Sequence, residues 1–122
     1  SNGTRAPVEV VLMERVGSDC PRVIQLLEWH ELRDGFVLVM ERPEPSLDLA
    51  EFIHPHQGLP EKMARWVFRQ VLEAVQHCTR CGVLHRDIKP DNILLNLDNG
   101  DVKLIDFGCG TYLQDKLYTT FA

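Results

Sequence analysis

Residues 85–92 read His-Arg-Asp-Ile-Lys-Pro-Asp-Asn, and residues 106–108 read Asp-Phe-Gly. The first stretch brings a carboxylate, an amine and an amide within six residues, and the second adds another carboxylate. Either short motif alone is weak evidence, because tripeptides recur by chance. Both motifs at this separation are strong evidence, and we therefore interpret them as a functional site rather than as a solvated charged loop. The pattern predicts one cleft lined by Asp87, Lys89, Asn92 and Asp106.

A predicted β-hairpin separates the two motifs. Ile93–Leu97 and Val102–Ile105 read as short strands, and they are joined by Asp98-Asn-Gly-Asp101. Asn-Gly is a strong hairpin signal, because both positions tolerate a positive φ. The two motifs therefore fall on loops that rigid elements present, which is where binding and catalytic residues concentrate.

A long helix is predicted over residues 60–81, with Pro60 at its start and Gly82 at its end. Apolar side chains recur on it at helical spacing, and others widen the stripe, so we expect core contacts on more than one side. This pattern indicates packing rather than a cofactor site. The stripe consists of Ala64, Val67, Phe68, Val71, Ala74, Val75 and Cys78, widened by Met63, Trp66 and Leu72.

The N-terminal third predicts a helix followed by a strand pair. Residues 7–16 have apolar positions at roughly helical spacing between Pro7 and Gly17. Val23–Trp29 reads as a strand, and Phe36–Met40 is a continuous apolar run that predicts a buried strand after the turn signal Asp34-Gly35.

A stiff linker follows at residues 41–45, Glu-Arg-Pro-Glu-Pro. Two prolines in three residues exclude both a helix and a central strand, so we place a boundary between two lobes here. Beyond it, Leu47–His54 predicts a short helix with Ser46 as its N-cap.

The composition is that of a soluble globular chain. It has 122 residues, of which 44% are hydrophobic and 25% charged, and its net charge is −5. The negative charge argues against nucleic acid as a partner, and no apolar run reaches membrane-spanning length. We expect a monomeric cytoplasmic or nuclear protein. We interpret both ends, Ser1 and Ala122, as truncations.

The four cysteines are expected to be reduced thiols. Cys78 and Cys81 form a Cys-x-x-Cys pair, which can indicate zinc or redox chemistry, but no second pair with ligand spacing exists. Buried or half-buried thiols are the preferred interpretation, and it covers Cys20 and Cys109 as well.

The residue types in the two motifs suit phosphoryl transfer with Mg²⁺. The roles given to these residues below are taken from the general pattern of phosphoryl-transfer sites, because the spacing alone does not assign them. Asp87 is the candidate base, against the alternative of a turn cap. Asn92 and Asp106 offer the hard oxygen ligands that Mg²⁺ prefers. Lys89 can place a compact positive charge on the transferring group. Arg86 is either a clamp for an acidic or phosphorylated side chain or part of a surface ion pair.

The chain resembles the protein kinases, and Lys89 two places after Asp87 resembles the serine/threonine class. More narrowly, it resembles the Pim family essentially from end to end. The matching stretches are Asn-Gly-Thr-Arg at 2–5, Glu-Val-Val-Leu at 9–12, Glu-Arg-Pro-Glu-Pro at 41–45, Gln-Val-Leu-Glu-Ala-Val at 70–75, Cys-Gly-Val-Leu-His-Arg-Asp-Ile-Lys at 81–89 and Lys-Leu-Ile-Asp-Phe-Gly at 103–108.

The resemblance implies an α+β, two-lobe kinase fold that is truncated. Residues 1–40 would be part of the N-lobe, residues 41–45 the hinge, and residues 46–122 part of the C-lobe, ending in the activation segment. ATP and Mg²⁺ would be the cofactors. The substrates would be proteins with basic residues near a serine or threonine.

The resemblance also implies a nucleotide site. Glu41 would offer its backbone carbonyl to adenine, and Pro43 has no N–H to donate there. The remaining positions are given by resemblance alone. They are Met40 as the gatekeeper, Leu94 and Ile105 as the adenine floor, Asp48 as a ribose- or substrate-facing carboxylate, and Glu9 as the partner of the ATP-binding lysine.

Two alternatives follow from what this sequence lacks. It contains neither a glycine-rich phosphate loop nor the strand that carries the ATP lysine, so we expect these 122 residues alone to be a poor catalyst. The first alternative is a kinase whose activity belongs to a longer protein. The second is a truncated, non-catalytic interaction fragment of such a kinase.

Cys109 stands where the family suggests serine, and Tyr118, Thr119 and Thr120 are candidate phosphorylation sites.

Overall fold

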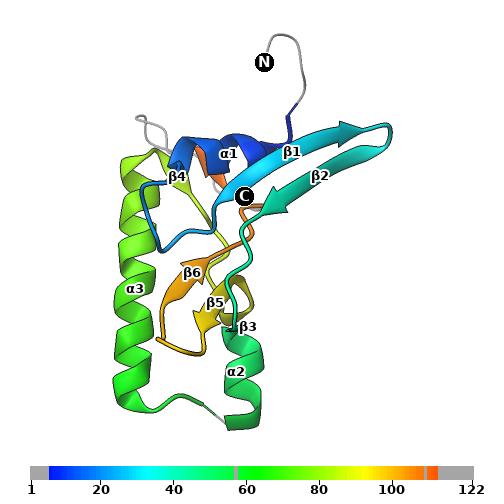
Figure 1. Cartoon of the computed structure of the whole chain (residues 1–122). Coiled ribbons are helices and arrows are strands. Elements are labelled where there is room, and N and C mark those ends of the chain that lie inside the picture. Colours follow the sequence, from blue (N-terminus) through cyan, green and yellow to red (C-terminus); the bar gives the residue numbers. More distant parts are fainter. Residues whose placement is uncertain (1–5, 57, 109, 113–122) are drawn as a thin grey trace.

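The computed structural model describes residues 6–56, 58–108 and 110–112, so Cys109 and the candidate phosphorylation sites lie outside the described residues. A long helix, α3, flanks a three-stranded sheet, and a separate hairpin projects from the body of the molecule (Figure 1). The elements in chain order are α1 (Val8–Val16), β1 (Leu26–Leu32), β2 (Gly35–Met40), β3 (Ser46–Asp48), α2 (Leu49–His56), α3 (Glu61–Arg80), β4 (Val83–Leu84), the 3₁₀ turn η1 (Pro90–Asn92), β5 (Ile93–Asn96), β6 (Val102–Leu104) and β7 (Thr111–Tyr112).

The central sheet has the order β3-β5-β6, with both pairings antiparallel. Ile93 pairs with Leu104 and Leu95 with Val102, which confirms the predicted hairpin between the two motifs. β3 was not predicted, because three residues carry no periodic signal of their own and become a strand only by pairing with β5.

The core lies between this sheet and one face of α3. Val67, Val71, Ala74 and Cys78 are buried on α3, and they belong to the same apolar cluster as the buried side chains of β5 and β6. The expectation of core contacts on more than one side of this helix is wrong for the part of the chain that the structure describes. Phe68 is 63% exposed and Leu72 42%, since no described element covers them, and Trp66 is 41% exposed although its indole bonds the Gly100 carbonyl.

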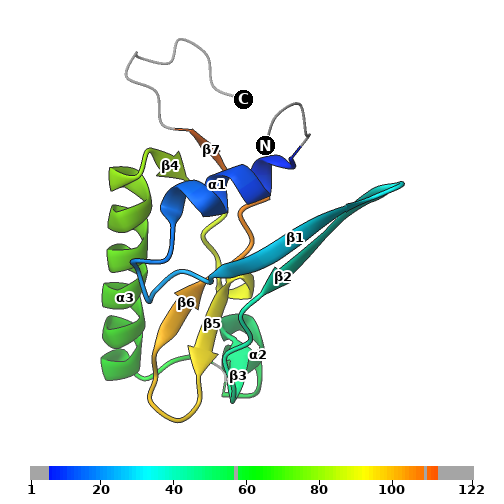
Figure 2. The same cartoon turned by 45° about the horizontal axis from the view of Figure 1, so that its top comes forward.

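The strand Phe36–Met40 is present as β2, but it is not buried as predicted. β1 and β2 form a two-stranded sheet that extends away from the other elements (Figure 2). Val37, Val39 and Met40 remain between 36% and 42% exposed, because a sheet strand is buried only where other layers cover its faces.

β1 begins three residues later than the predicted strand. Val23 and Ile24 do not belong to β1, and they bond the strand β6 instead: Ile24 donates its N–H to the Leu104 carbonyl at 3.0 Å. The buried apolar side chains that suggested a strand here are therefore core residues in an irregular segment.

Ser46 is not the N-cap of α2, as expected, because it lies in β3. Asp48 takes that place: its Oδ1 accepts the Glu51 N–H at 2.8 Å, and Glu51 Oε1 accepts the Asp48 N–H at 3.0 Å. This reciprocal pair is a capping box, and it moves the start of the helix from Leu47 to Leu49.

Two other predictions are confirmed. α1 covers Val8–Val16 and ends at Gly17, whose φ of 75° favours glycine. Residues 41–45 form neither helix nor strand. No helix in the described ranges combines the length and the apolar character that crossing a membrane requires.

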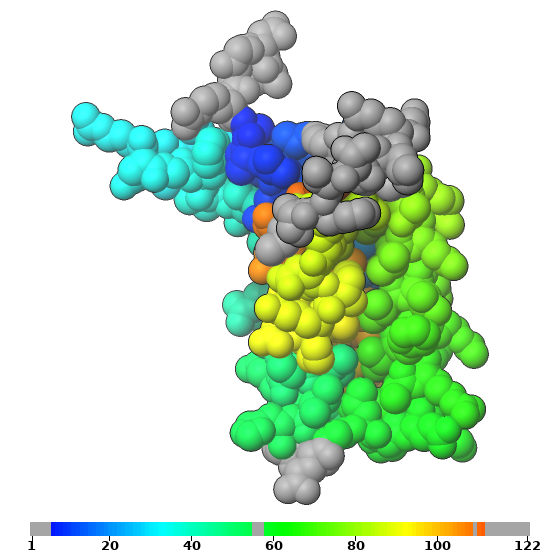
Figure 3. All heavy atoms as spheres, turned by 180° about the vertical axis from the view of Figure 1, so that it is seen from behind, coloured from blue at the N-terminus to red at the C-terminus, as the bar shows by residue number. Residues whose placement is uncertain are grey.

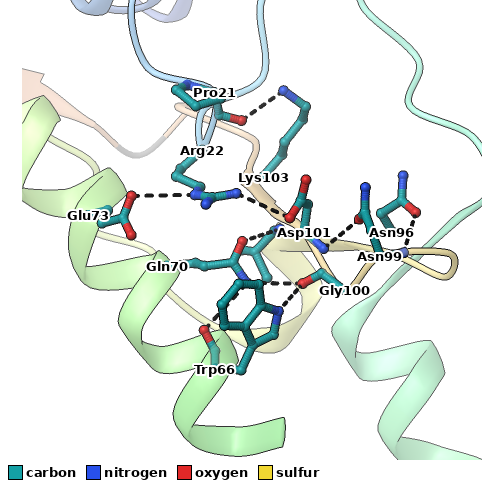
Figure 4. Close-up of polar contacts among 11 residues, drawn as sticks. Pro21, Arg22, Trp66, Gln70, Glu73, Asn96, Asn99, Gly100, Asp101 and Lys103 are labelled. Carbon is teal, nitrogen blue, oxygen red and sulfur yellow. Dashed lines mark hydrogen bonds and ion pairs between the residues drawn. The ribbon is translucent and has the colours of Figure 1, made fainter.

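Gln70 fastens the β5–β6 connection to α3 (Figure 4). Its side chain is 1% exposed. Its Nε2 donates to the Gly100 carbonyl at 2.9 Å, and its Oε1 accepts the Val102 N–H at 2.9 Å. Trp66 Nε1 donates to the same Gly100 carbonyl at 2.7 Å. The hairpin is thus held to the helix by hydrogen bonds at the end farthest from the two motifs.

Replacing Gln70 with Met should lower the free energy of unfolding by about 1–3 kcal/mol, because Val102 N–H would be left buried without a partner. Chemical denaturation measures the effect. The matched control is Gln76→Met on the exposed side of the same helix, which should change stability by less than about 0.5 kcal/mol. Equal effects of the two substitutions would contradict this account.

Candidate functional site

His85 joins the two predicted motifs. Its Nδ1 accepts the Asp87 N–H at 3.1 Å, so its Nε2 carries the proton that bonds the Ile105 carbonyl at 2.7 Å. The ring is 5% exposed and packs edge-on against Phe107, with ring centroids 4.7 Å apart. The bridging role of His85 was not predicted, because nothing in the sequence pairs residue 85 with residue 105.

Asp87, Lys89 and Asn92 form one contact group on the loop that ends at η1. Asn92 Nδ2 donates to Asp87 Oδ2 at 3.0 Å and to the Asp87 carbonyl at 2.9 Å. Lys89 Nζ lies 3.8 Å from Asp87 Oδ1. The Asp87 side chain is 29% exposed, whereas Asn92 is buried. The aspartate is therefore held from the protein side and open to solvent on the other.

Asp106 lies at the same end of the β5–β6 hairpin as Asn92. Ile105 donates its N–H to the Asn92 carbonyl at 3.0 Å, one step beyond the Ile93–Leu104 pair. The exposed Asp106 follows at once, with a positive φ of 62° that turns the chain out of the strand. The space-filling view from behind shows the loop around residue 90 at the surface (Figure 3).

Glu9 of α1 reaches this region as well. Its Oε2 accepts the N–H of Phe107 at 3.3 Å, and Phe107 itself is fully buried. In the described structure, Glu9 thus ties α1 to the Asp-Phe-Gly segment. The lysine partner that the resemblance implies for Glu9 is not needed for this contact.

The predicted nucleotide-facing residues collect around one face of the hairpin. Ile93 and Leu95 point into the core, so Leu94 lies on the opposite face, as Lys103 and Ile105 do on β6. Asp48 pairs in register with Leu94. Glu41 reaches the same face through a 3.2 Å contact between its Oε1 and Lys103 Nζ.

Met40 ends β2, where it pairs with Leu26 and is 37% exposed. The carboxylate of Asp48 is engaged in the capping box of α2. These placements are compatible with the predicted roles, and the roles themselves stay predictions.

Asn92 and Asp106 are suited to a magnesium ion that arrives with phosphate. The amide nitrogen of Asn92 is committed to Asp87, which leaves the amide oxygen for a cation, and the Asp106 carboxylate is exposed. Across residues 6–56, 58–108 and 110–112, no group of three or more His, Cys, Asp or Glu side chains could hold a metal by itself. Mg²⁺ commonly takes one or two protein oxygens and completes its shell with phosphate and water.

The cysteines that the structure describes are free thiols, as predicted for Cys20, Cys78 and Cys81. Burial raises the pKa of Cys78 from 9.0 to about 12, with further contributions from the neighbouring Cys20 and Cys81. A thiol that stays protonated at neutral pH is a poor nucleophile and a poor metal ligand. Burial therefore makes Cys78 a poor nucleophile.

Cys78 in the folded protein should react with iodoacetamide at least about a hundredfold more slowly at pH 8 than in the denatured protein. Peptide mapping by mass spectrometry measures the rate, and the half-exposed Cys81 serves as the internal control. The Cys78 thiol keeps its proton to a higher pH in the folded protein than in the unfolded chain. This thiol should therefore lower the free energy of unfolding as the pH rises from about 9 towards 12. Rapid labelling of native Cys78 would contradict the burial argument.

Comparison with known proteins shows the family of the chain. The family described as Protein kinase domain matches residues 1–122. Serine/threonine-protein kinase prk-2 of Caenorhabditis elegans is 42% identical over 120 residues, which is 98% of this chain and 27% of the relative. Serine/threonine-protein kinase pim-2 of Danio rerio is 40% identical over 122 residues, covering 94% of this chain and 39% of the relative.

A third relative is matched over a smaller share of its own length. The PAS domain-containing serine/threonine-protein kinase of Mus musculus is 38% identical over 118 residues, or 96% of this chain and 8% of the relative. The chain thus spans well under half of the length of each of these curated relatives.

Proposed function

This chain belongs to the protein kinase domain family, and we propose that the protein that carries it transfers the γ-phosphoryl group of ATP to serine or threonine hydroxyls. The expected kinase-like α+β fold class is confirmed by this match. The single observation that carries the proposal is the contact group of Asp87, Lys89 and Asn92 beside Asp106. Within the family, the likeness to prk-2 and pim-2 supports a Pim-like serine/threonine kinase.

Asp87 is the proposed base. A hydroxyl must be positioned and must lose its proton as the phosphoryl group arrives. The Asn92 amide fixes Oδ2 of Asp87, so the carboxylate can face an incoming hydroxyl without reorganising. Lys89 is 52% exposed, and its charge can follow the transferring group.

Asn92 and Asp106 are the proposed ligands of Mg²⁺. When bound with ATP, the ion would neutralise charge on the phosphates. The protein contributes two oxygens at the end of a paired hairpin, whose spacing is fixed by the bond between Ile105 N–H and the Asn92 carbonyl.

The face that carries Leu94 and Ile105 is the proposed adenine floor, with Met40 and the backbone of Glu41 beside it. Residues 41–45 would then be the hinge between an N-lobe part, 1–40, and a C-lobe part, 46–122. Pro43 cannot donate a backbone hydrogen bond, so one contact with adenine that other kinases make would be absent.

The proposed substrates are proteins with basic residues near the acceptor hydroxyl. The candidates for an acidic approach to the cleft are Glu44, Asp48, Glu51 and Asp91. Two of them, Asp48 and Glu51, cap α2. Glu44 contacts Arg42 at 2.9 Å between Oε1 and Nε. Asp91, exposed on η1, is therefore the best placed of the four to meet a basic peptide. A monomeric state and a cytoplasmic or nuclear location stay predictions.

Asp87→Asn should lower kcat for a basic serine or threonine peptide by on the order of a hundredfold or more, because the base is removed. Asparagine can still accept the bond from Asn92, so the affinity for ATP should change little. Asp98→Asn, exposed in the turn at the other end of the β5–β6 hairpin, is the matched control and should keep the kcat. Activity of Asp87→Asn close to that of the unchanged protein would refute the assignment.

The same assay distinguishes the kinase proposal from the alternative, a non-catalytic interaction fragment. The intact protein that carries this sequence should bind ATP with Mg²⁺ and phosphorylate the peptide. Binding of kinase partners without any nucleotide binding or phosphoryl transfer would favour the interaction fragment.

A further inference from the structure

Glu41, the first residue of the linker, is tied on two sides. It donates its N–H to the Gln25 carbonyl at 3.0 Å, and its Oε1 accepts the Gln25 N–H at 2.8 Å. The same oxygen lies 3.2 Å from Lys103 Nζ on β6. We propose that the Glu41–Lys103 ion pair fixes the nucleotide-facing linker relative to the strand that leads to Asp106. This inference rests on the proposed function.

Lys103 sits three residues before Asp106 and makes a second bond that orients it. Its Nζ donates to the Pro21 carbonyl at 2.8 Å (Figure 4). The neighbouring Leu104 donates its N–H to the Arg22 carbonyl at 2.7 Å. Residues 21–25 therefore contact both β6 and the linker. The Glu41–Lys103 ion pair adds a direct contact between the linker and β6.

Partial burial distinguishes this pair from the surface ion pairs of the chain. The side chains of Lys103 and Glu41 are 22% and 29% exposed, whereas those of Arg65 and Glu61 on α3 are 77% and 78% exposed. Solvent screens an exposed pair until it contributes almost nothing, and screens a partly buried pair less.

Packing alone does not join the linker to β6. A cavity of about 120 Å³ lies between them, lined by Pro43, Leu94 and Lys103 among others. Ser46 also lines it, and its Oγ is buried without a hydrogen-bond partner among the residues that the structure describes. Because apolar contact is interrupted here, polar contacts such as the Glu41–Lys103 pair keep the linker in position.

The consequence is a division between binding and chemistry. Neither side chain is placed at the transferring phosphoryl group, so both act as positioning residues. Loosening the pair lets the linker shift over the Leu94 face and weakens adenine binding. Asp87 and Asn92 are held by their own contacts and keep their geometry.

The test uses the intact protein that carries this sequence, with Lys103→Met, Glu41→Gln, the double variant and Lys103→Arg. Glu41→Gln keeps an oxygen for the Gln25 N–H and removes only the charge. Readouts are the Kd for adenosine, which lacks phosphate, and KM and kcat with ATP. Arg65→Met, from the exposed pair on α3, is the control.

Each single variant should raise the Kd for adenosine and the KM for ATP about fivefold, with kcat changed less than about twofold. The double variant should be no worse than either single one, and Lys103→Arg should bind like the unchanged protein. The inference would be overturned if the single variants bound adenosine unchanged, or if their losses of affinity added up in the double variant. A fall in kcat that follows a loss of stability would also overturn it. An unchanged protein that neither binds adenosine nor transfers phosphate would overturn the proposed function itself, which is a distinguishable result.

Discussion

The antiparallel pairing of β5 with β6 is the constraint on which the rest of the site depends. The loop that carries Asp87 runs into β5, and Asp106 follows β6, so the register of the hairpin sets the separation of the two motifs. The last step of this register is the bond from Ile105 N–H to the Asn92 carbonyl, 3.0 Å long. A one-residue slip of β5 against β6 would turn either Leu94 or Ile105 into the core and move Asn92 away from Asp106.

The hairpin is held at both ends by side chains that bond backbone groups. At the turn, Gln70 and Trp66 of α3 bind the carbonyl of Gly100. At the motif end, His85 bonds the Ile105 carbonyl and the Asp87 N–H. Buried polar side chains can fix a backbone this closely only when all of their hydrogen bonds are formed. The reason is that a buried polar group without a partner costs more free energy than one hydrogen bond contributes to stability. The rigidity that the proposed phosphoryl-transfer site would need thus comes from a few satisfied polar contacts added to an apolar core.

The hydrophobic pattern of the chain predicts more burial than the described residues show. Phe68 and Leu72 on α3 and Val37 on β2 were expected to be buried, and they are exposed. Periodicity reports which residues favour burial, whereas burial itself needs a second element on that face. The chain spans 27% of the length of the relative prk-2 and 39% of that of pim-2.

The amino-acid sequence was enough to predict the protein kinase family, the two motifs, the hairpin between them, and α1 and α3. These features depend on local signals: proline and glycine at helix ends, Asn-Gly in the turn, and residue types whose chemistry is tied to short spacings. Only the tertiary structure decided that Asp48 rather than Ser46 caps α2, that His85 bridges the motifs, and that Glu41 meets Lys103 across 62 residues of chain. The physical reason is that these contacts join residues whose proximity arises from strand pairing and packing. No local pattern in the sequence records such contacts.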